Sequence, residues 1–196
     1  GRAEYPRMML AHAKVQYKDN RVARPDWPAL KGTMPNGTMP ILELKDGKKI
    51  GQSQNVMRYL GKVYGYYPKN PLEAAKVDFL VENYNDVYTK FNLVNFAKPE
   101  DKEAKIAEVF DKLFPDLMAN LAPSIPENGF LFGEKLTIAD FWIGGLYTNF
   151  MNSPSIGYAP EKWAKTKEDY PVFAAYGERF AKENAEYLSK REGRPF

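Results

Sequence analysis

The spacing of apolar and polar residues changes along this chain, and the change divides the chain into two parts. Short apolar runs bounded by turn-forming residues predict strands in the first third, over 15–22, 41–45 and 48–51. Apolar positions at helical spacing predict helices over 3–14 and from Ser53 onward. The Asp46-Gly47 pair favours a two-residue hairpin turn between the last two strands. We therefore expect a small α/β domain over residues 1–66.

Beyond a proline-containing linker over 67–71, the apolar spacing is helical throughout. It predicts helices over 72–91, 101–121, 136–151 and 171–183. Pro115 should kink or divide the second of these, because proline removes an intrahelical hydrogen bond. Thr137 and Asp140 open the third helix as the carboxylate form of a capping box. These segments predict an all-α domain over 72–196.

The composition excludes several classes of chemistry. The 28 basic and 25 acidic residues nearly balance and form no basic block, so we expect neither nucleic-acid nor membrane binding. The chain has no cysteine, which excludes a disulfide framework, a thiolate metal site and a cysteine nucleophile. Its single histidine, His12, excludes a multi-histidine zinc site and leaves little room for a Ser/His/Asp triad. We expect a cytoplasmic protein that needs no metal.

Pro40 stands at the head of the 41–45 strand, an unusual place for a residue that cannot donate a hydrogen bond to a ladder. An X-Pro bond can be cis at modest cost. A cis bond here would turn the backbone of Met39 out of its own sheet, leaving its N–H and C=O to pair with an extended peptide. Alternatively, Pro40 merely ends a loop and starts an edge strand.

Gln52 and Ser53 lie where the 48–51 strand gives way to a helix. Ser53 is the expected N-cap, and the free N–H groups of a helix start attract a carboxylate. The hairpin brings this corner beside Met39. A peptide-like ligand with a carboxylate could therefore bind both places at once.

Three groups of motifs resemble those of the glutathione transferases, and in particular of their sigma-like group. GRAE (1–4) with RV (21–22) and DWP (26–28) resembles the first helix and following loop of that group. MPILEL, DG and QS within 39–53 resemble its cis-proline strand, hairpin and serine-containing helix start. GEKLTIAD (133–140) resembles the capping box at the centre of its second domain. The resemblance covers essentially the whole chain and implies a thioredoxin-like N-terminal domain, an all-helical C-terminal domain and glutathione as co-substrate.

The resemblance also implies how glutathione is held. The backbone of Met39, preceding Pro40, would pair with the cysteinyl part of the tripeptide. Gln52 and Ser53 would hold the γ-glutamyl carboxylate.

The other end of the tripeptide and its surroundings involve residues farther apart in the sequence. The resemblance implies that Trp27 and Lys31 hold the glycyl carboxylate and that Arg2 lies near the thiol. Asp86 would reach the γ-glutamyl amine bound by the neighbouring subunit of a homodimer. Each could instead be an ordinary surface residue. Thr38 departs from the group's pattern, because many sigma-like members carry a lysine there.

The implied activity is conjugation of the glutathione thiolate to small apolar electrophiles, or a glutathione-dependent isomerisation or peroxide reduction in the same pocket. Tyr88 and Leu93 are candidates for the electrophile pocket, although the aromatic residues of the 72–91 helix are expected mainly in the core. The alternative is a non-catalytic structural or binding protein, like the lens crystallins derived from sigma-like transferases.

In the family, a tyrosine hydroxyl donates to the glutathione sulfur and favours the thiolate. That tyrosine stands on a strand that precedes the GRAE motif, and none of the 13 tyrosines here stands in its motif. The resemblance therefore leads us to expect the strand and its tyrosine before Gly1 in a longer parent protein. On this expectation the sequence as given contains no catalytic residue and is inactive by itself.

Overall fold

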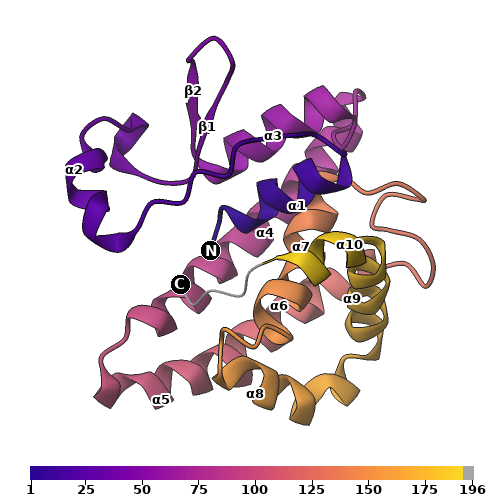
Figure 1. The fold of residues 1–196 in the computed structure, drawn as a ribbon. Coiled ribbons are helices and arrows are strands. Elements are labelled where there is room, and N and C mark those ends of the chain that lie inside the picture. Colours follow the sequence, from indigo (N-terminus) through magenta and orange to yellow (C-terminus); the bar gives the residue numbers. More distant parts are fainter. Residues whose placement is uncertain (192–196) are drawn as a thin grey trace. The chain divides into compact units, whose positions relative to one another are not determined.

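The computed structural model describes residues 1–191, which are drawn in Figure 1. The chain forms two compact units, one from Gly1 to Tyr67 and the other from Pro68 onward. The first unit contains a β-hairpin between helices, and the second is built of helices. The expected order, an α/β part followed by an all-helical part, is confirmed.

The first unit is organised around two helices and a hairpin. Its elements are α1 (Glu4–His12), α2 (Trp27–Lys31), β1 (Ile41–Glu43), β2 (Lys49–Gly51) and α3 (Ser53–Tyr64), with 3-10 turns at Arg24–Asp26 and Pro35–Gly37. The helices α1 and α3 pack against each other. Their buried apolar side chains form the core of this unit: Tyr5, Met8, Met9, Val56, Met57 and Leu60.

The hairpin turn differs from the two-residue turn that the sequence favoured. β1 and β2 pair antiparallel, and the N–H of Leu44 donates to the carbonyl of Lys48 at 2.8 Å, which closes a three-residue loop over 45–47. Gly47 has φ +81°, the left-handed conformation that ends such a loop. The carboxylate of Asp46 accepts hydrogen bonds from both the backbone N–H and the ammonium of Lys48. Because these bonds hold the extra residue in place, the longer loop is formed.

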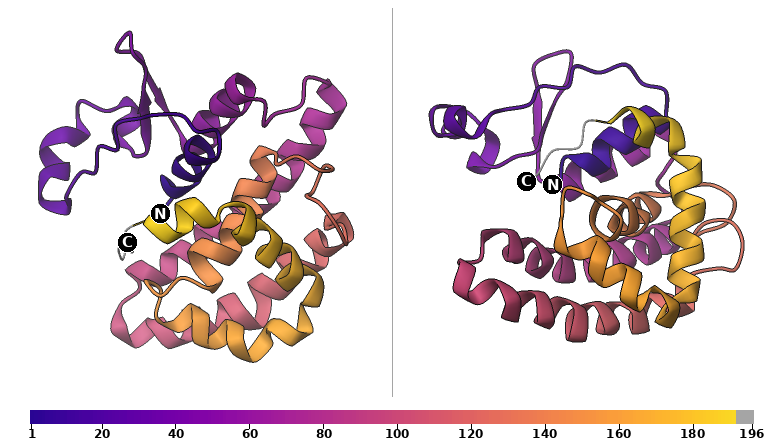
Figure 2. Two further views of the ribbon diagram at one scale, coloured as in Figure 1. Left: turned by 45° about the vertical axis from the view of Figure 1, so that its right-hand side comes forward. Right: turned by 60° about the horizontal axis from the view of Figure 1, so that its bottom comes forward.

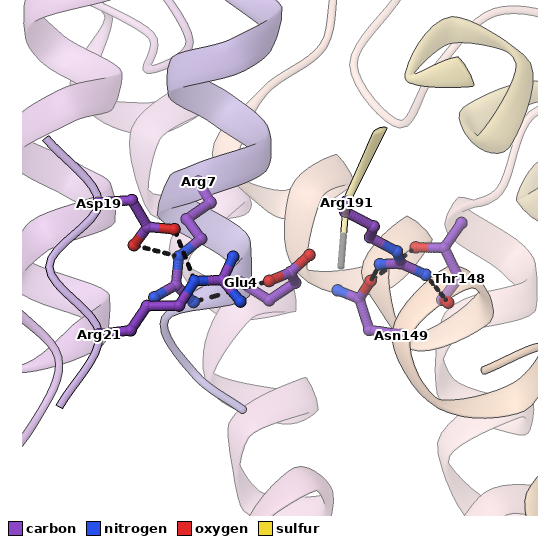
Figure 3. A network of polar contacts seen from close by, with 7 residues as sticks. All are labelled: Glu4, Arg7, Asp19, Arg21, Thr148, Asn149 and Arg191. Atoms are coloured by element: carbon purple, nitrogen blue, oxygen red, sulfur yellow. Dashed lines mark hydrogen bonds and ion pairs between the residues drawn. The ribbon is translucent and has the colours of Figure 1, made fainter. Parts of the chain in front are cut away.

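The strand expected over 15–22 is absent, so this prediction was wrong. Residues 15–23 form no ladder, because no neighbouring strand among the described residues offers the N–H and C=O partners that a strand requires. The segment is held by charge instead: Asp19 accepts from Arg7 Nε at 3.0 Å and from Arg21 Nε at 2.8 Å (Figure 3). Burial opposes the ionisation of Asp19, but the two arginines outweigh it and lower the pKa of its carboxyl group.

The second unit is a stack of helices. They are α4 (Pro71–Leu93), α5 (Pro99–Glu108), α6 (Phe114–Leu121), α7 (Ile138–Leu146), α8 (Tyr158–Thr166), α9 (Pro171–Glu183) and α10 (Ala185–Lys190), with 3-10 turns at Val94–Phe96, Ala122–Ser124 and Lys167–Asp169. The sequence analysis predicted neither α8 nor α10, although α8 is as long as α7. Within residues 1–191, no helix is both long enough and apolar enough to span a bilayer.

Two π-helical turns interrupt the longer helical stretches of this unit. The first, η4 (Val109–Leu113), joins α5 to α6 just before Pro115, so the expected division of the 101–121 segment is confirmed. The second, η6 (Tyr147–Met151), continues α7. Arg191 donates to the carbonyl oxygen of Thr148 and to the side chain of Asn149, which fixes the end of the described chain to η6 (Figure 3).

α7 is the central helix of the second unit, and all nine of its residues are buried. It packs on α4 and α9, and in the right-hand view of Figure 2 it is the orange helix seen nearly end-on. The expected capping box is present: the backbone N–H of Thr137 donates to Asp140 Oδ2 at 2.7 Å. Asp140 also accepts from the backbone N–H of Leu131 at 2.9 Å and from the hydroxyl of Tyr176 at 2.8 Å. The carboxylate therefore joins the start of α7 to the preceding loop and to α9.

Candidate functional site

The first unit places the Met39–Pro40 peptide beside the start of α3. Ile41 pairs with Gly51 across the hairpin, so the residues just before β1 face those just after β2. The Met39–Pro40 bond is cis, as expected, and Met39 is 46% exposed. Its backbone N–H and C=O make no hydrogen bond with any of residues 1–191. These two groups can therefore pair with an extended ligand backbone.

The start of α3 differs in one respect from the expectation. Ser53 is the first residue of the helix, and Gln52 occupies the N-cap position with φ +66°. Positive φ at a non-glycine residue is strained and is common at functional sites. The first helical bond runs from Val56 N–H to Gln52 C=O at 2.9 Å. The N–H groups of residues 53–55 therefore point out of the helix, and no other described residue accepts from them.

Two side chains add donors at this helix start. Ser53 is 6% exposed. Its hydroxyl has no hydrogen-bond partner in the described part of the chain, but it remains accessible to solvent. The amide nitrogen of Gln54 is buried without a hydrogen-bond partner there. The sequence analysis did not identify Gln54. The only sequence signal for this residue is its position next to Ser53. The free N–H groups of residues 53–55 and the Ser53 hydroxyl are donors suited to an anion.

α2 brings Trp27 and Lys31 onto one face, because they stand four residues apart at its two ends. Trp27 is half-buried and Lys31 is exposed. The Lys31 stem lies against the loop that leads to Met39: a Cβ added to Gly37 would lie 3.3 Å from Lys31 Cγ. The same loop packs Pro35 against Gly51, at the end of β2. The loop thus connects the face of α2 that carries Trp27 and Lys31 to the Met39 corner, by which we mean Met39 and the adjacent start of α3.

The remaining candidates lie elsewhere in the fold. Arg2 is half-buried and lies two residues before Glu4, the first residue of α1. Asp86 and Leu93 are exposed on α4 of the second unit. Tyr88 is 3% exposed and packs in the core of that unit, with its ring centroid 5.5 Å from that of Tyr84. The roles of these four residues stay predictions.

The arrangement in the first unit suits one kind of ligand. Unpaired main-chain groups at Met39 can hold an extended backbone, and the N-terminus of α3 can hold a carboxylate. The indole and ammonium of α2, Trp27 and Lys31, provide donors for a second carboxylate. The site therefore matches a short peptide with a carboxylate at each end.

Comparison with known proteins identifies the family of this chain. The sequence profile of the glutathione S-transferase N-terminal domain matches residues 3–63, and that of the C-terminal domain matches residues 85–191. The chain belongs to the glutathione S-transferase family. The first unit is accordingly the thioredoxin-like domain of a glutathione transferase, and the second is its helical domain.

Individual relatives place this chain with the sigma-like members of the family. It is 39% identical to glutathione S-transferase S1 of Drosophila melanogaster over 76% of this chain and 60% of that protein. The matched region therefore spans less than two thirds of that relative. S-crystallin SL11 of Nototodarus sloanii is 28% identical over 100% of this chain and 94% of that protein. Monomeric Na-GST-3 of Necator americanus superimposes with a TM-score of 0.85 at 27% identity, covering 100% and 95% of the two chains.

Proposed function

We propose that this transferase binds glutathione through its thioredoxin-like domain and conjugates the thiolate to small apolar electrophiles. The observation that carries the proposal is the corner at Met39, where unpaired backbone groups lie beside the open N-terminus of α3. A γ-glutamyl carboxylate at Ser53 and a cysteinyl backbone at Met39 satisfy both sets of groups. The glycyl carboxylate then extends toward Trp27 and Lys31.

The residues of this chain bind and orient glutathione. The backbone of Met39 fixes the cysteinyl residue in an extended conformation, which determines where its sulfur points. The N-terminal dipole of α3 and the Lys31 ammonium neutralise the two carboxylates. We assign thiol activation to no residue among 1–196, so the proposal rests first on binding and then on turnover.

The proposal is tested with the full-length protein, glutathione and a broad panel of apolar electrophiles, peroxides and isomerisable substrates. We expect saturable binding of glutathione and glutathione-dependent turnover of at least one class. Binding without turnover would favour the alternative, a non-catalytic protein of transferase fold, which the match to a crystallin over the whole chain supports. Absence of both would contradict the proposal.

The glycyl end of the site gives a specific prediction at Lys31. Lys31→Met keeps the stem that packs on Gly37 and removes the charge. Because the ammonium is exposed, we expect a loss of about 1 kcal/mol in glutathione binding, roughly fivefold in Kd, and a weaker dependence of Kd on salt. Isothermal titration calorimetry at two ionic strengths measures both. Lys45→Met, at an exposed position in the hairpin loop, is the matched control and should bind as wild type does.

We also propose that the transferase functions as a homodimer in which Asp86 of one copy reaches the γ-glutamyl ammonium bound by the other. The proposal is supported by the exposure of Asp86 and by its having no hydrogen bond or ion pair with the described residues. One relative of closely similar fold is described as monomeric, which makes the assembly worth measuring directly.

Asp86→Asn keeps the side-chain shape and removes the charge. We expect it to weaken glutathione binding by about 1–3 kcal/mol, the range for a charged hydrogen bond, without dissociating the dimer. Calorimetry and sedimentation equilibrium of the full-length protein test the two parts separately, with Asp101→Asn on α5 as the matched control. If the wild-type protein sedimented as a monomer and still bound glutathione tightly, Asp86 would have no such role.

A further inference from the structure

Asn55 is a polar residue in the first turn of α3 that the sequence analysis did not single out. Its side-chain amide nitrogen donates to the backbone carbonyl of Gly51 at 3.3 Å. A carbonyl oxygen can only accept, so the NH₂ group of the amide must face it. Gly51 is the last residue of β2, and Asn55 is the third residue of α3. This bond therefore ties the helix to the strand that precedes it.

Gly51 lies where three segments of the first unit meet. It pairs with Ile41 across the hairpin, next to the Met39–Pro40 peptide. A Cβ added to Gly51 would lie 3.2 Å from Ile41 Cδ1 and 3.3 Å from Cβ of Pro35, which belongs to the loop after α2. By holding Gly51, Asn55 fixes the start of α3 relative to the strand and the loop that lead to Met39.

Gln52 is the residue whose conformation this bond restricts, and its φ of +66° is strained. Two hydrogen bonds from the first turn of α3 hold the peptide groups on either side of it. The Asn55 side chain holds the carbonyl before Gln52, and the N–H of Val56 holds the carbonyl of Gln52 itself at 2.9 Å. The first bond restricts φ and the second restricts ψ, because each of these dihedrals turns one of the two peptide groups about the Cα atom. A strained conformation persists only where its surroundings determine it.

We propose that Asn55 is a positioning residue for glutathione, an inference that rests on the proposed function. It acts through Gln52, which it keeps in the conformation that places the start of α3 beside Met39. Without the Asn55 bond, Gln52 can relax to a negative φ, which rotates the peptide between Gly51 and Gln52. The free N–H groups of residues 53–55 then lose their alignment with the Met39 backbone, and a single tripeptide no longer satisfies both.

Asn55→Ala removes the donor and adds no charge. Alanine is the better helix former, so we expect the urea midpoint to be unchanged or raised. Calorimetry of the full-length protein should nevertheless show glutathione binding weakened about fivefold, the effect of one hydrogen bond. Asn55→Gln keeps an amide that can reach back from this position, and should bind within about twofold of wild type. Asn120→Ala, at an exposed position of α6, is the matched control and should leave Kd unchanged.

A second measurement, on the ligand-free protein, reports the conformation of Gln52 directly. The three-bond coupling between its amide and α protons depends on φ, so we expect the coupling to change in Asn55→Ala and to keep its wild-type value in Asn55→Gln. An unchanged coupling in Asn55→Ala, or wild-type affinity for glutathione in that variant, would overturn the proposal. So would equal losses of affinity in the two Asn55 variants. If the wild-type protein bound no glutathione, the proposed function would fail instead, and the coupling would still decide whether Asn55 holds Gln52.

Discussion

Replacing Asp140 with alanine is expected to lower the free energy of unfolding by about 3–5 kcal/mol, because one fully buried carboxylate serves several donors. Asp140 is 0% exposed and accepts from the backbone N–H groups of Leu131 and Thr137, and from the hydroxyls of Thr137 and Tyr176. Alanine leaves these donors unpaired in the interior, and each orphaned group costs about 1–3 kcal/mol. Burial raises the pKa of Asp140, and the four hydrogen bonds oppose that shift.

Urea unfolding of the variant measures this loss. Asp101→Ala, at an exposed position in the first turn of α5, is the matched control and should cost less than about 1 kcal/mol. Tyr176→Phe removes one donor and leaves the carboxylate in place, so we expect an intermediate loss of about 1–2 kcal/mol. If Asp140→Ala melted with the midpoint of Asp101→Ala, the capping box would have no stabilising role.

Gly144→Ala should cost about 2–4 kcal/mol, because α7 and α9 leave no room for a methyl group. A Cβ at Gly144 would lie 2.2 Å from Cγ of Phe180, whose ring is buried between the two helices. The ring cannot swing away as the end of a flexible chain would, so the helices must separate.

Gly157→Ala is the matched control for this change. Gly157 has φ −51°, and no atom lies within 4 Å of its added Cβ. We expect this variant to be neutral or more stable by about 0.4–1 kcal/mol, since alanine restricts the unfolded chain. Equal midpoints for the two variants in urea would show that the contact between Gly144 and Phe180 relaxes without cost.

The features of the fold that depend on local chemistry could be predicted from the sequence. The capping box at Thr137, the division of a helix at Pro115 and the turn of the chain at Pro40 each follow from one or two residues with a defined geometric effect. The features that depend on a neighbouring segment of the chain could not be predicted. The apolar pattern over 15–22 does not reveal whether a strand lies beside it, and the described chain places none there.

The candidate site shows the same limit. Pro40 stands just before β1 and Gln52 just after β2. The register of the hairpin then brings the two residues together. Whether Ser53 caps α3 or begins it depends on the backbone angles of Gln52, which a propensity for N-caps does not determine. Gln54 carries no motif at all. The burial of its side-chain amide depends on how α3 packs, which the sequence pattern does not show.

In our proposal, glutathione lies between Met39 and the start of α3 in the thioredoxin-like domain. The direct measurement is a titration of the ¹⁵N-labelled full-length protein with glutathione, followed by the backbone amide signals. We expect the largest shifts at the amides of Met39, Ser53 and Gln54, and smaller shifts at Trp27 and Lys31. Saturable shifts that spare Met39 and the start of α3, or no shifts at millimolar glutathione, would contradict it.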